Sequence, residues 1–362
     1  GGIGICITGN VMIDKRALGE PGNVVIEDKS NMTALKSWAK AATQNNTHCW
    51  VQLNHPGKQS PKGLNKENVS PSAVPFKDKL KSFFATPRAL TEDEIWDLIN
   101  RYGTAAGIVQ EAGFTGVQIH GAHGYLVSQF LSPHHNIRTD QWGGSPENRR
   151  KFVLEVYKSM RKNTSPDFPI SIKLNSADFQ KGGFTEEESL DTIRELSKAG
   201  IDLIEISGGT YEAPAMTGVK MKESTKVREA YFLDFADKAR KISDVPLAVT
   251  GGFISAEGIA QAISTNATDF AGIARSLAIE PDLPNKLKKK KKALYPIKPI
   301  KTGIPMVDKM GIMEVSFYTG QLERIGKGKN PNPNEYPLFS FFKVLLRQVG
   351  ITKRWPSKLR AN

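Results

Sequence analysis

The chain has 362 residues, of which 39% are hydrophobic and 24% are charged, and its formal net charge is +13. Its two cysteines, Cys6 and Cys49, exclude a disulfide framework and a cysteine-held zinc or iron–sulfur cluster, and they favour a reducing, cytoplasmic setting. No apolar run reaches transmembrane length, and no positively charged segment precedes the apolar opening GGIGICITGNVMI, so we expect a strand there and not a signal peptide.

The positive charge is concentrated at the C-terminal end of the chain. Residues 285–362 contain 18 Lys/Arg and 4 Asp/Glu, a net of +14, whereas residues 1–284 contain 32 basic and 33 acidic residues. We therefore expect two parts, a nearly neutral body over 1–284 and a basic extension over 285–362. We expect no nucleic-acid binding by the body.

Short β-branched apolar runs alternate with helical patterns along the body. The pattern predicts strands over 3–8, 49–53, 116–120, 169–174, 202–206, 246–250 and 269–274. It predicts helices over 32–43, 92–111, 146–162, 186–198, 228–242 and 256–264, and capping boxes at Thr91 and Thr185 mark two of their starts. This alternation indicates an α/β fold with a parallel sheet, one unit short of a (β/α)8 TIM barrel.

Residues 59–90 form a long polar segment with several prolines between two of these elements. Loops of this length in compact domains are usually lids or binding loops, so we expect the segment to cover the site. A purely structural insertion is the alternative.

The strand over 116–120 ends in a group of side chains that can carry chemistry. His120, His123 and Tyr125 follow one another where this strand passes into a loop, which is the edge at which parallel α/β proteins bind ligands. Imidazoles can donate hydrogen bonds to a carbonyl or phenolate oxygen, and a phenol can protonate an electron-rich carbon. Loop packing is one alternative. A metal site is another, but no third ligand lies close in sequence, so we expect no metal.

The segment over 120–149, HGAHGYLVSQFLSPHHNIRTDQWGGSPENR, resembles the signature of the Old Yellow Enzyme family of FMN-dependent ene-reductases (NADH:flavin oxidoreductases). The resemblance extends in pieces over residues 1–284. It implies a TIM barrel in which Gly1 corresponds to the start of the second strand, so that the first strand would be missing at the N-terminus. A barrel without that strand would have two unpaired edges.

The resemblance also implies roles for the residues of the motif. His120 and His123 would bind the oxygen of the substrate, and Tyr125 would be the proton donor. The other signature residues would hold the loop in place; they are Arg138, Asp140, Gly143, Gly144 and Arg149. His55, in a His-x-Gly pattern, would lie at the rim, and a structural role is the alternative.

Four residues at strand ends are implied as contacts of the flavin ring: Gly9, Asn10, Gln52 and Lys173. A glutamine offers both a donor and an acceptor to the edge of the ring. Lys173 replaces the commoner arginine, and a lysine there is costly to bury without an anion, which reduced flavin would supply. Pairing of Lys173 with Asp178 or Glu205 is the alternative. Tyr211 and the loop to Arg228 would shape substrate choice.

The last two strand ends carry a candidate phosphate site. Gly251 and Gly252 follow one strand, and Ala274 and Arg275 follow the next. Phosphates in TIM barrels bind after strands seven and eight, where glycines allow close approach and an arginine can neutralise charge. The family resemblance places the FMN phosphate on the same four residues, with Ala274 in place of the commoner glycine.

The basic extension contains two notable segments. Residues 286–292 include five consecutive lysines and are expected to form a solvated loop. Residues 338–349 have the pattern of an amphipathic helix, which we expect to pack against the barrel or against a second subunit of a homo-oligomer. Peripheral membrane contact is the alternative use.

We therefore expect an FMN-dependent oxidoreductase that uses NADH or NADPH to reduce the activated C=C bond of an α,β-unsaturated carbonyl compound, or enone. The lack of a cysteine cluster argues against the larger dienoyl-CoA reductases of the family. Three alternatives are open. One is a flavin-free phosphate-binding barrel, such as an aldolase or isomerase. Another is a truncated non-catalytic barrel that binds a partner or a membrane through its tail, and the third is nucleic-acid binding, which rests only on the lysine run.

Overall fold

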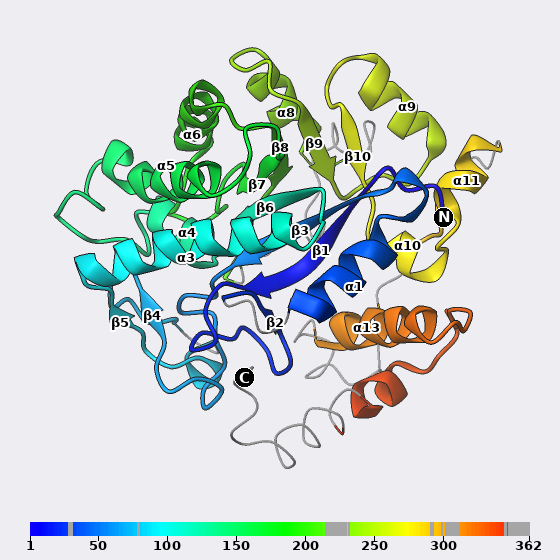
Figure 1. Ribbon diagram of the computed structural model, residues 1–362, viewed down its shortest axis with the longest axis horizontal. Helices are drawn as coiled ribbons and strands as arrows, with labels where there is room; N and C mark the ends of the chain where they lie inside the picture. The colour runs from blue at the N-terminus through cyan, green and yellow to red at the C-terminus, as the bar shows by residue number, and fades with distance from the viewer. Residues whose placement is uncertain are drawn as a thin grey trace.

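The computed structural model describes residues 1–27, 32–77, 80–210, 212–213, 230, 232–289, 293–297, 300, 312–343 and 346. Within them, eight strands form one curved parallel sheet with helices on its outer side (Figure 1). The strands are β1 (Ile5–Met12), β2 (Val24–Val25), β3 (His48–Asn54), β6 (Gly116–Gly121), β7 (Ile170–Asn175), β8 (Leu203–Ser207), β9 (Leu247–Thr250) and β10 (Phe270–Gly272). Their order in the sheet is β10-β9-β8-β7-β6-β3-β1-β2.

The sheet confirms the predicted barrel architecture with its incomplete ring. All seven predicted strands are present and follow one another in barrel order, and β2 is a short addition at one edge. In the described part of the chain, no hydrogen-bonded pairing joins β10 to β1. The sheet is thus an open (β/α)8-type barrel.

Strand β1 continues past its predicted end at Thr8 because it contains a β-bulge. Ile7 pairs with Trp50 and Asn10 pairs with Gln52, so β1 has one residue more than β3 over this interval. The Thr8 hydroxyl accepts a hydrogen bond from the backbone of Gln52 at 3.0 Å, which ties the bulge to β3. Bulges locally redirect side chains, and this one places Asn10 level with Gln52.

Helices cover the outer face of the sheet. The long ones are α1 (Met32–Ala42), α3 (Glu92–Glu111), α5 (Pro146–Lys162), α6 (Glu186–Ala199), α8 (Leu233–Arg240) and α9 (Ala256–Ser264). Both predicted capping boxes, at Thr91 and Thr185, are formed. Helix α8 begins later than the predicted residue 228, and residues 228, 229 and 231 lie outside the described part. Short helices α4 (Leu126–Leu131) and α10 (Arg275–Ile279) follow strands β6 and β10.

The inner face of the sheet changes character along the strands. Near the amino ends, Trp50, Leu203 and Ala248 form an apolar cluster with Ile5 and Ile7. Because side chains alternate along a strand, the inward positions two residues further on are Gln52 in β3 and Glu205 in β8. The apolar floor therefore supports a polar layer at the carboxyl ends, where sites in this fold lie.

The segment 59–90 is more ordered than a plain loop. It contains β4 (Val69–Ser70) and β5 (Arg88–Ala89), which pair in parallel, and α2 (Leu80–Phe83). Its backbone oxygens at Pro71 and Leu90 accept hydrogen bonds from Arg138, at 3.0 and 2.7 Å. This segment is therefore fastened to the loop after α4.

The basic extension differs from the expected solvated loop at its start. Helix α11 (Leu283–Lys288) contains the first lysines of the run, and residues 290–292 lie outside the described part. Lysine is a good helix former, and Lys286 is paired with Glu280 and Asp282, which offsets the repulsion between lysines. The expectation of a loop was thus wrong for residues 286–288.

Further along the extension, α13 (Ile312–Gly326) lies beside α10 (Figure 1). Residues 337–343 are helical, and most of the rest of the predicted helix over 338–349 lies outside the described part. Among the described helices, none is long and apolar enough to cross a membrane.

Candidate active site

The three rings of the motif after β6 come together at the carboxyl end of the barrel. The ring centroid of His120 lies 5.2 Å from that of His123 and 4.7 Å from that of Tyr125. His123 has a positive φ of 60°, a strained conformation for a residue other than glycine, which often marks a functional turn. The Tyr125 hydroxyl accepts a hydrogen bond from the amide of Asn10 at 3.3 Å. The structure therefore groups four of the predicted residues.

Neighbouring strands hold the two histidines in place. The Nε2 atom of His123 lies 2.7 Å from the hydroxyl of Ser207 at the end of β8, and its backbone N–H donates to Asn175 at the end of β7. The Nδ1 atom of His120 accepts from the backbone N–H of Ala122 at 3.3 Å. A neutral ring that accepts at Nδ1 carries its hydrogen on Nε2, so His120 presents a donor there.

Both imidazoles are neutral. Burial, together with the nearby His123 and Lys173, holds the pKa of His120 well below its ordinary value. Burial also lowers the pKa of His123 to about 3, and the charge of Lys173 contributes. A neutral His120 can donate one hydrogen bond through Nε2, and a neutral His123 can donate through Nδ1 when its Nε2 accepts from Ser207.

Glu205 is the centre of a second group of polar side chains on the inner face. Its carboxylate accepts from Gln118 at 2.8 Å and from the Thr250 hydroxyl at 2.6 Å, and it lies 3.0 Å from the ammonium of Lys173. Gln118 in turn accepts from the amide of Gln52 at 2.7 Å. The alternative expectation, that Lys173 pairs with Glu205, is thus what the structure shows.

This group determines which way the amide of Gln52 points. A carboxylate only accepts hydrogen bonds, so Gln118 turns its NH2 group toward Glu205 and its oxygen toward Gln52. Gln52 must then donate to Gln118 through its own NH2 group. Its carbonyl oxygen is left as a potential acceptor.

The chemistry of these residues fits the ring of a flavin. The ring edge carries an N–H group, from which the oxygen of Gln52 can accept a hydrogen bond. Next to it lies the N1–C2=O region, which gains negative charge on reduction. Lys173 supplies a positive charge on the same polar layer. Gly9, by contrast, lies exposed in the bulge of β1, and Asn10 contacts Tyr125. Flavin contact by Gly9 and Asn10 stays a prediction.

The candidate phosphate residues lie at the ends of β9 and β10. Gly251 and Gly252 directly follow Thr250 and have φ values of 98° and 93°, which side chains other than glycine rarely adopt. Ala274 has a φ of −122°, which lies outside the left-handed region that favours glycine. Arg275, the first residue of α10, is partly exposed and lies 3.4 Å from Glu314 of α13. Two glycines that allow close approach of the backbone, together with a guanidinium, fit a phosphate group.

The structure corrects or completes several other expectations. His55 is not at a rim: it is 2% exposed, its Nδ1 accepts from the backbone of Gly57, and burial lowers its pKa to about 4. Asp178 does not pair with Lys173 but accepts hydrogen bonds from Ser132 and from the backbone of Phe184. Tyr211 and residues 214–228 lie outside the described part.

The remaining signature residues hold the loop after α4, as expected. Arg138 pairs with Asp140, and Arg149 donates to the backbone oxygens of Leu131 and Gly144. These contacts fix the segment between α4 and α5 without reaching the polar layer.

The sequence of the chain matches one family over most of its length. Residues 1–293 match the family described as NADH:flavin oxidoreductase / NADH oxidase. A protein of Hypocrea jecorina (strain QM6a) named NADH-dependent flavin oxidoreductase iliE is 37% identical over 309 residues, with 78% of this chain and 76% of that protein covered. The NADPH dehydrogenase of Geobacillus sp. (strain WCH70) is 28% identical over 281 residues, with 76% and 78% covered.

Solved structures share the fold. The structure of a 2-naphthoyl-CoA reductase in complex with 2-naphthoyl-CoA has a TM-score of 0.72 and 28% identity, and the match covers 80% of this chain and 45% of that one. The Old Yellow Enzyme homologue of Zymomonas mobilis has a TM-score of 0.70 and 23% identity, with 92% and 85% covered. The latter likeness concerns the fold alone.

Proposed function

Because the chain belongs to the NADH:flavin oxidoreductase / NADH oxidase family, and is therefore an FMN-dependent oxidoreductase with NADH or NADPH as reductant, we propose that it reduces the activated C=C bond of α,β-unsaturated carbonyl compounds. The observation that carries the proposal is the grouping of His120, His123 and Tyr125 at the carboxyl end of the barrel. It combines two neutral hydrogen-bond donors with one hydroxyl acid.

Each of the three residues has a distinct role in this proposal. His120 and His123 hold the carbonyl oxygen of the substrate by hydrogen bonds, which draws electron density away from the β-carbon. Tyr125 gives its proton to the α-carbon. Asn10, which donates to the Tyr125 oxygen, stabilises the phenolate that remains.

FMN, when bound, supplies the two-electron redox chemistry that these side chains lack. We assign its ring edge to Gln52 and Lys173 and its phosphate to Gly251, Gly252, Ala274 and Arg275. Glu205 and Gln118 position the first two by the contacts described above. Family membership counts against both the flavin-free barrel and the non-catalytic barrel.

The direct test uses the FMN-loaded chain, reduced with one equivalent of NADH under anaerobic conditions and then mixed with 2-cyclohexen-1-one. The expected result is reoxidation of the flavin with formation of an equal amount of cyclohexanone. If the reduced flavin is reoxidised by oxygen or by a quinone but forms no cyclohexanone from the enone, the proposal of enone reduction is refuted. The oxidoreductase activity itself would still stand.

A further inference from the structure

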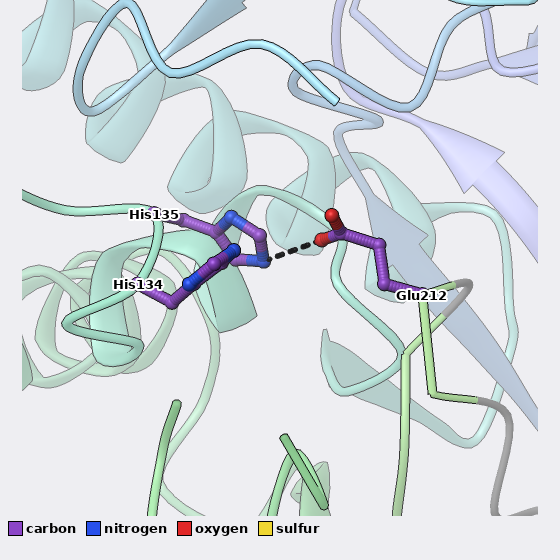
Figure 2. Close-up of side chains that lie close together, drawn as sticks. All are labelled: His134, His135 and Glu212. Atoms are coloured by element: carbon purple, nitrogen blue, oxygen red, sulfur yellow. Dashed lines mark ion pairs between the residues drawn. The ribbon is translucent and has the colours of Figure 1, made fainter. Parts of the chain in front are cut away.

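A second cluster of ligand-type side chains lies outside the polar layer. His134 and His135 follow α4, and Glu212 follows β8 (Figure 2). One ligand atom from each residue lies within 4.8 Å of the other two. The Nε2 atom of His135 is 3.5 Å from a carboxylate oxygen of Glu212, and the two imidazole centroids are 4.8 Å apart. The two loops therefore bring two imidazoles and a carboxylate to one point.

The cluster contains buried polar atoms without hydrogen-bond partners. The Nδ1 atom of His135 and the Oε2 atom of Glu212 are both buried and form no hydrogen bond in the described structure, and Oε2 has only the 3.5 Å contact with Nε2 of His135. The side chain of His135 is 2% exposed and that of Glu212 is 14% exposed. A buried acceptor without a partner costs on the order of 1–3 kcal/mol, so these atoms indicate that the cluster has a ligand.

The charges of the cluster favour a cation. No lysine or arginine among the described residues forms an ion pair with Glu212. Lys58 is a buried cation near Glu212, but in the described structure its ammonium donates to the backbone oxygen of Val74 and not to that carboxylate.

We propose that His134, His135 and Glu212 bind one divalent transition-metal ion of the Zn²⁺ type. Neutral imidazole nitrogens with a carboxylate oxygen are preferred ligands of Zn²⁺, Co²⁺ and Ni²⁺, whereas Mg²⁺ and Ca²⁺ prefer oxygen alone. Three protein ligands leave at least one coordination position for water. No residue of this site is assigned to the reaction proposed above.

The position of the site gives it a structural effect on the active site. Glu212 lies two residues after Thr210, which forms a β-bridge with His123. An ion held between Glu212 and the two histidines would fasten the loop after β8 to the segment after α4. It would thereby restrict the loop that borders His123.

The test uses the full FMN-loaded chain, freed of metal by dialysis against a chelator and then titrated with Zn²⁺ and, separately, Co²⁺. We expect one equivalent to stay bound after gel filtration. Bound Co²⁺ should show visible bands at wavelengths longer than those absorbed by oxidised flavin, and Zn²⁺ should raise the melting temperature in a concentration-dependent way.

Two variants and one control identify the ligands. Glu212→Gln and His135→Gln should each weaken Zn²⁺ binding by more than about 100-fold, since even partners of metal ligands are worth about 10- to 100-fold. His48→Gln changes an exposed histidine at the start of β3 and should bind like the unchanged protein. FMN content and the melting temperature without metal report whether each variant is folded. Failure to bind Zn²⁺, equal binding by folded Glu212→Gln, or loss of binding in His48→Gln would each overturn the proposal.

Discussion

Lys173 and Glu205 are register partners on the neighbouring strands β7 and β8, and the ammonium of Lys173 lies 3.0 Å from the carboxylate of Glu205. Both side chains are largely buried, at 17% and 4% exposure. Lys173 is therefore half of a largely buried ion pair between neighbouring strands. Its influence on a bound flavin depends on how much of its charge Glu205 cancels.

Replacing Glu205 should raise the reduction potential of bound FMN. Glu205→Gln keeps the shape of the side chain and removes the negative charge that offsets Lys173, so reduced flavin is stabilised. We expect a rise on the order of 30 mV, which corresponds to about 1.4 kcal/mol for two electrons. The measurement is a spectroelectrochemical titration of the FMN-loaded protein. Lys173→Met is the matched opposite change and should lower the potential; if both potentials stay where they are, the pair does not tune the flavin.

Replacing Tyr125 should separate the two half-reactions. Tyr125→Phe removes the proposed acid and leaves the ring in contact with His120. Anaerobic stopped-flow should show flavin reoxidation by 2-cyclohexen-1-one slowed by about 100-fold or more, the usual contribution of general acid catalysis. Flavin reduction by NADH should stay within a few-fold. Equal slowing of both half-reactions would contradict the role of Tyr125.

Replacing Arg275 should weaken FMN binding more than substrate binding. Arg275→Ala removes the guanidinium at the end of β10, and charge-assisted hydrogen bonds contribute about 1.5–3 kcal/mol, which is about 10- to 100-fold in Kd. Recovery of FMN fluorescence on dilution measures the loss. Lys286→Ala removes an equal charge from α11 and serves as the control. If the Arg275→Ala variant keeps its FMN but binds the enone poorly, Arg275 belongs to the substrate site and not to the phosphate site.

Burial of His55 should make the stability of the fold dependent on pH in the acid range. Its pKa is lowered to about 4 in the folded chain, whereas an unfolded histidine titrates near 6.5, so the unfolded chain binds one more proton between these values. Above about pH 6.5, the neutral His55 makes its full contribution to the free energy of unfolding. That free energy falls by up to about 1.4 kcal/mol per pH unit as the pH drops toward 4.

The variant His55→Asn tests this dependence. Asparagine keeps an acceptor for the backbone N–H of Gly57 and does not titrate in this range. Urea unfolding at several pH values should show that the free energy of unfolding depends less steeply on pH in the variant. The difference in slope should correspond to about one bound proton. An identical dependence in both proteins would assign the acid sensitivity to other groups.

Local patterns were enough to predict most of the fold. The alternation of apolar runs and helical periods predicts the seven strands of the barrel, and the capping boxes predict two helix starts at their observed positions. Strand β2 was missed because two residues carry no periodicity. The end of β1 was misplaced because Gly9 reads as a turn, whereas pairing on β3 carries the strand through the bulge.

The site was predictable where its residues lie on one strand end, and less so where they meet across strands. His120, His123 and Tyr125 are close in sequence and were expected together. Glu205 was considered only as a partner of Lys173, and Gln118 was missed, since their contacts depend on strand register and not on any local motif. His134, His135 and Glu212 were missed for the same reason, because two separate loops bring them together.

The contact between Arg275 and Glu314 has a thermodynamic consequence for the basic extension. Arg275 belongs to the proposed phosphate site, whereas Glu314 belongs to α13. A phosphate held by Arg275 would share the charge of that guanidinium with Glu314, and the two anions would repel each other, so the contact with α13 would weaken. Because such coupling is reciprocal, a partner that captures α13 would in turn tighten the binding of FMN. The strength with which α13 is held would thus depend on whether FMN is bound to the barrel.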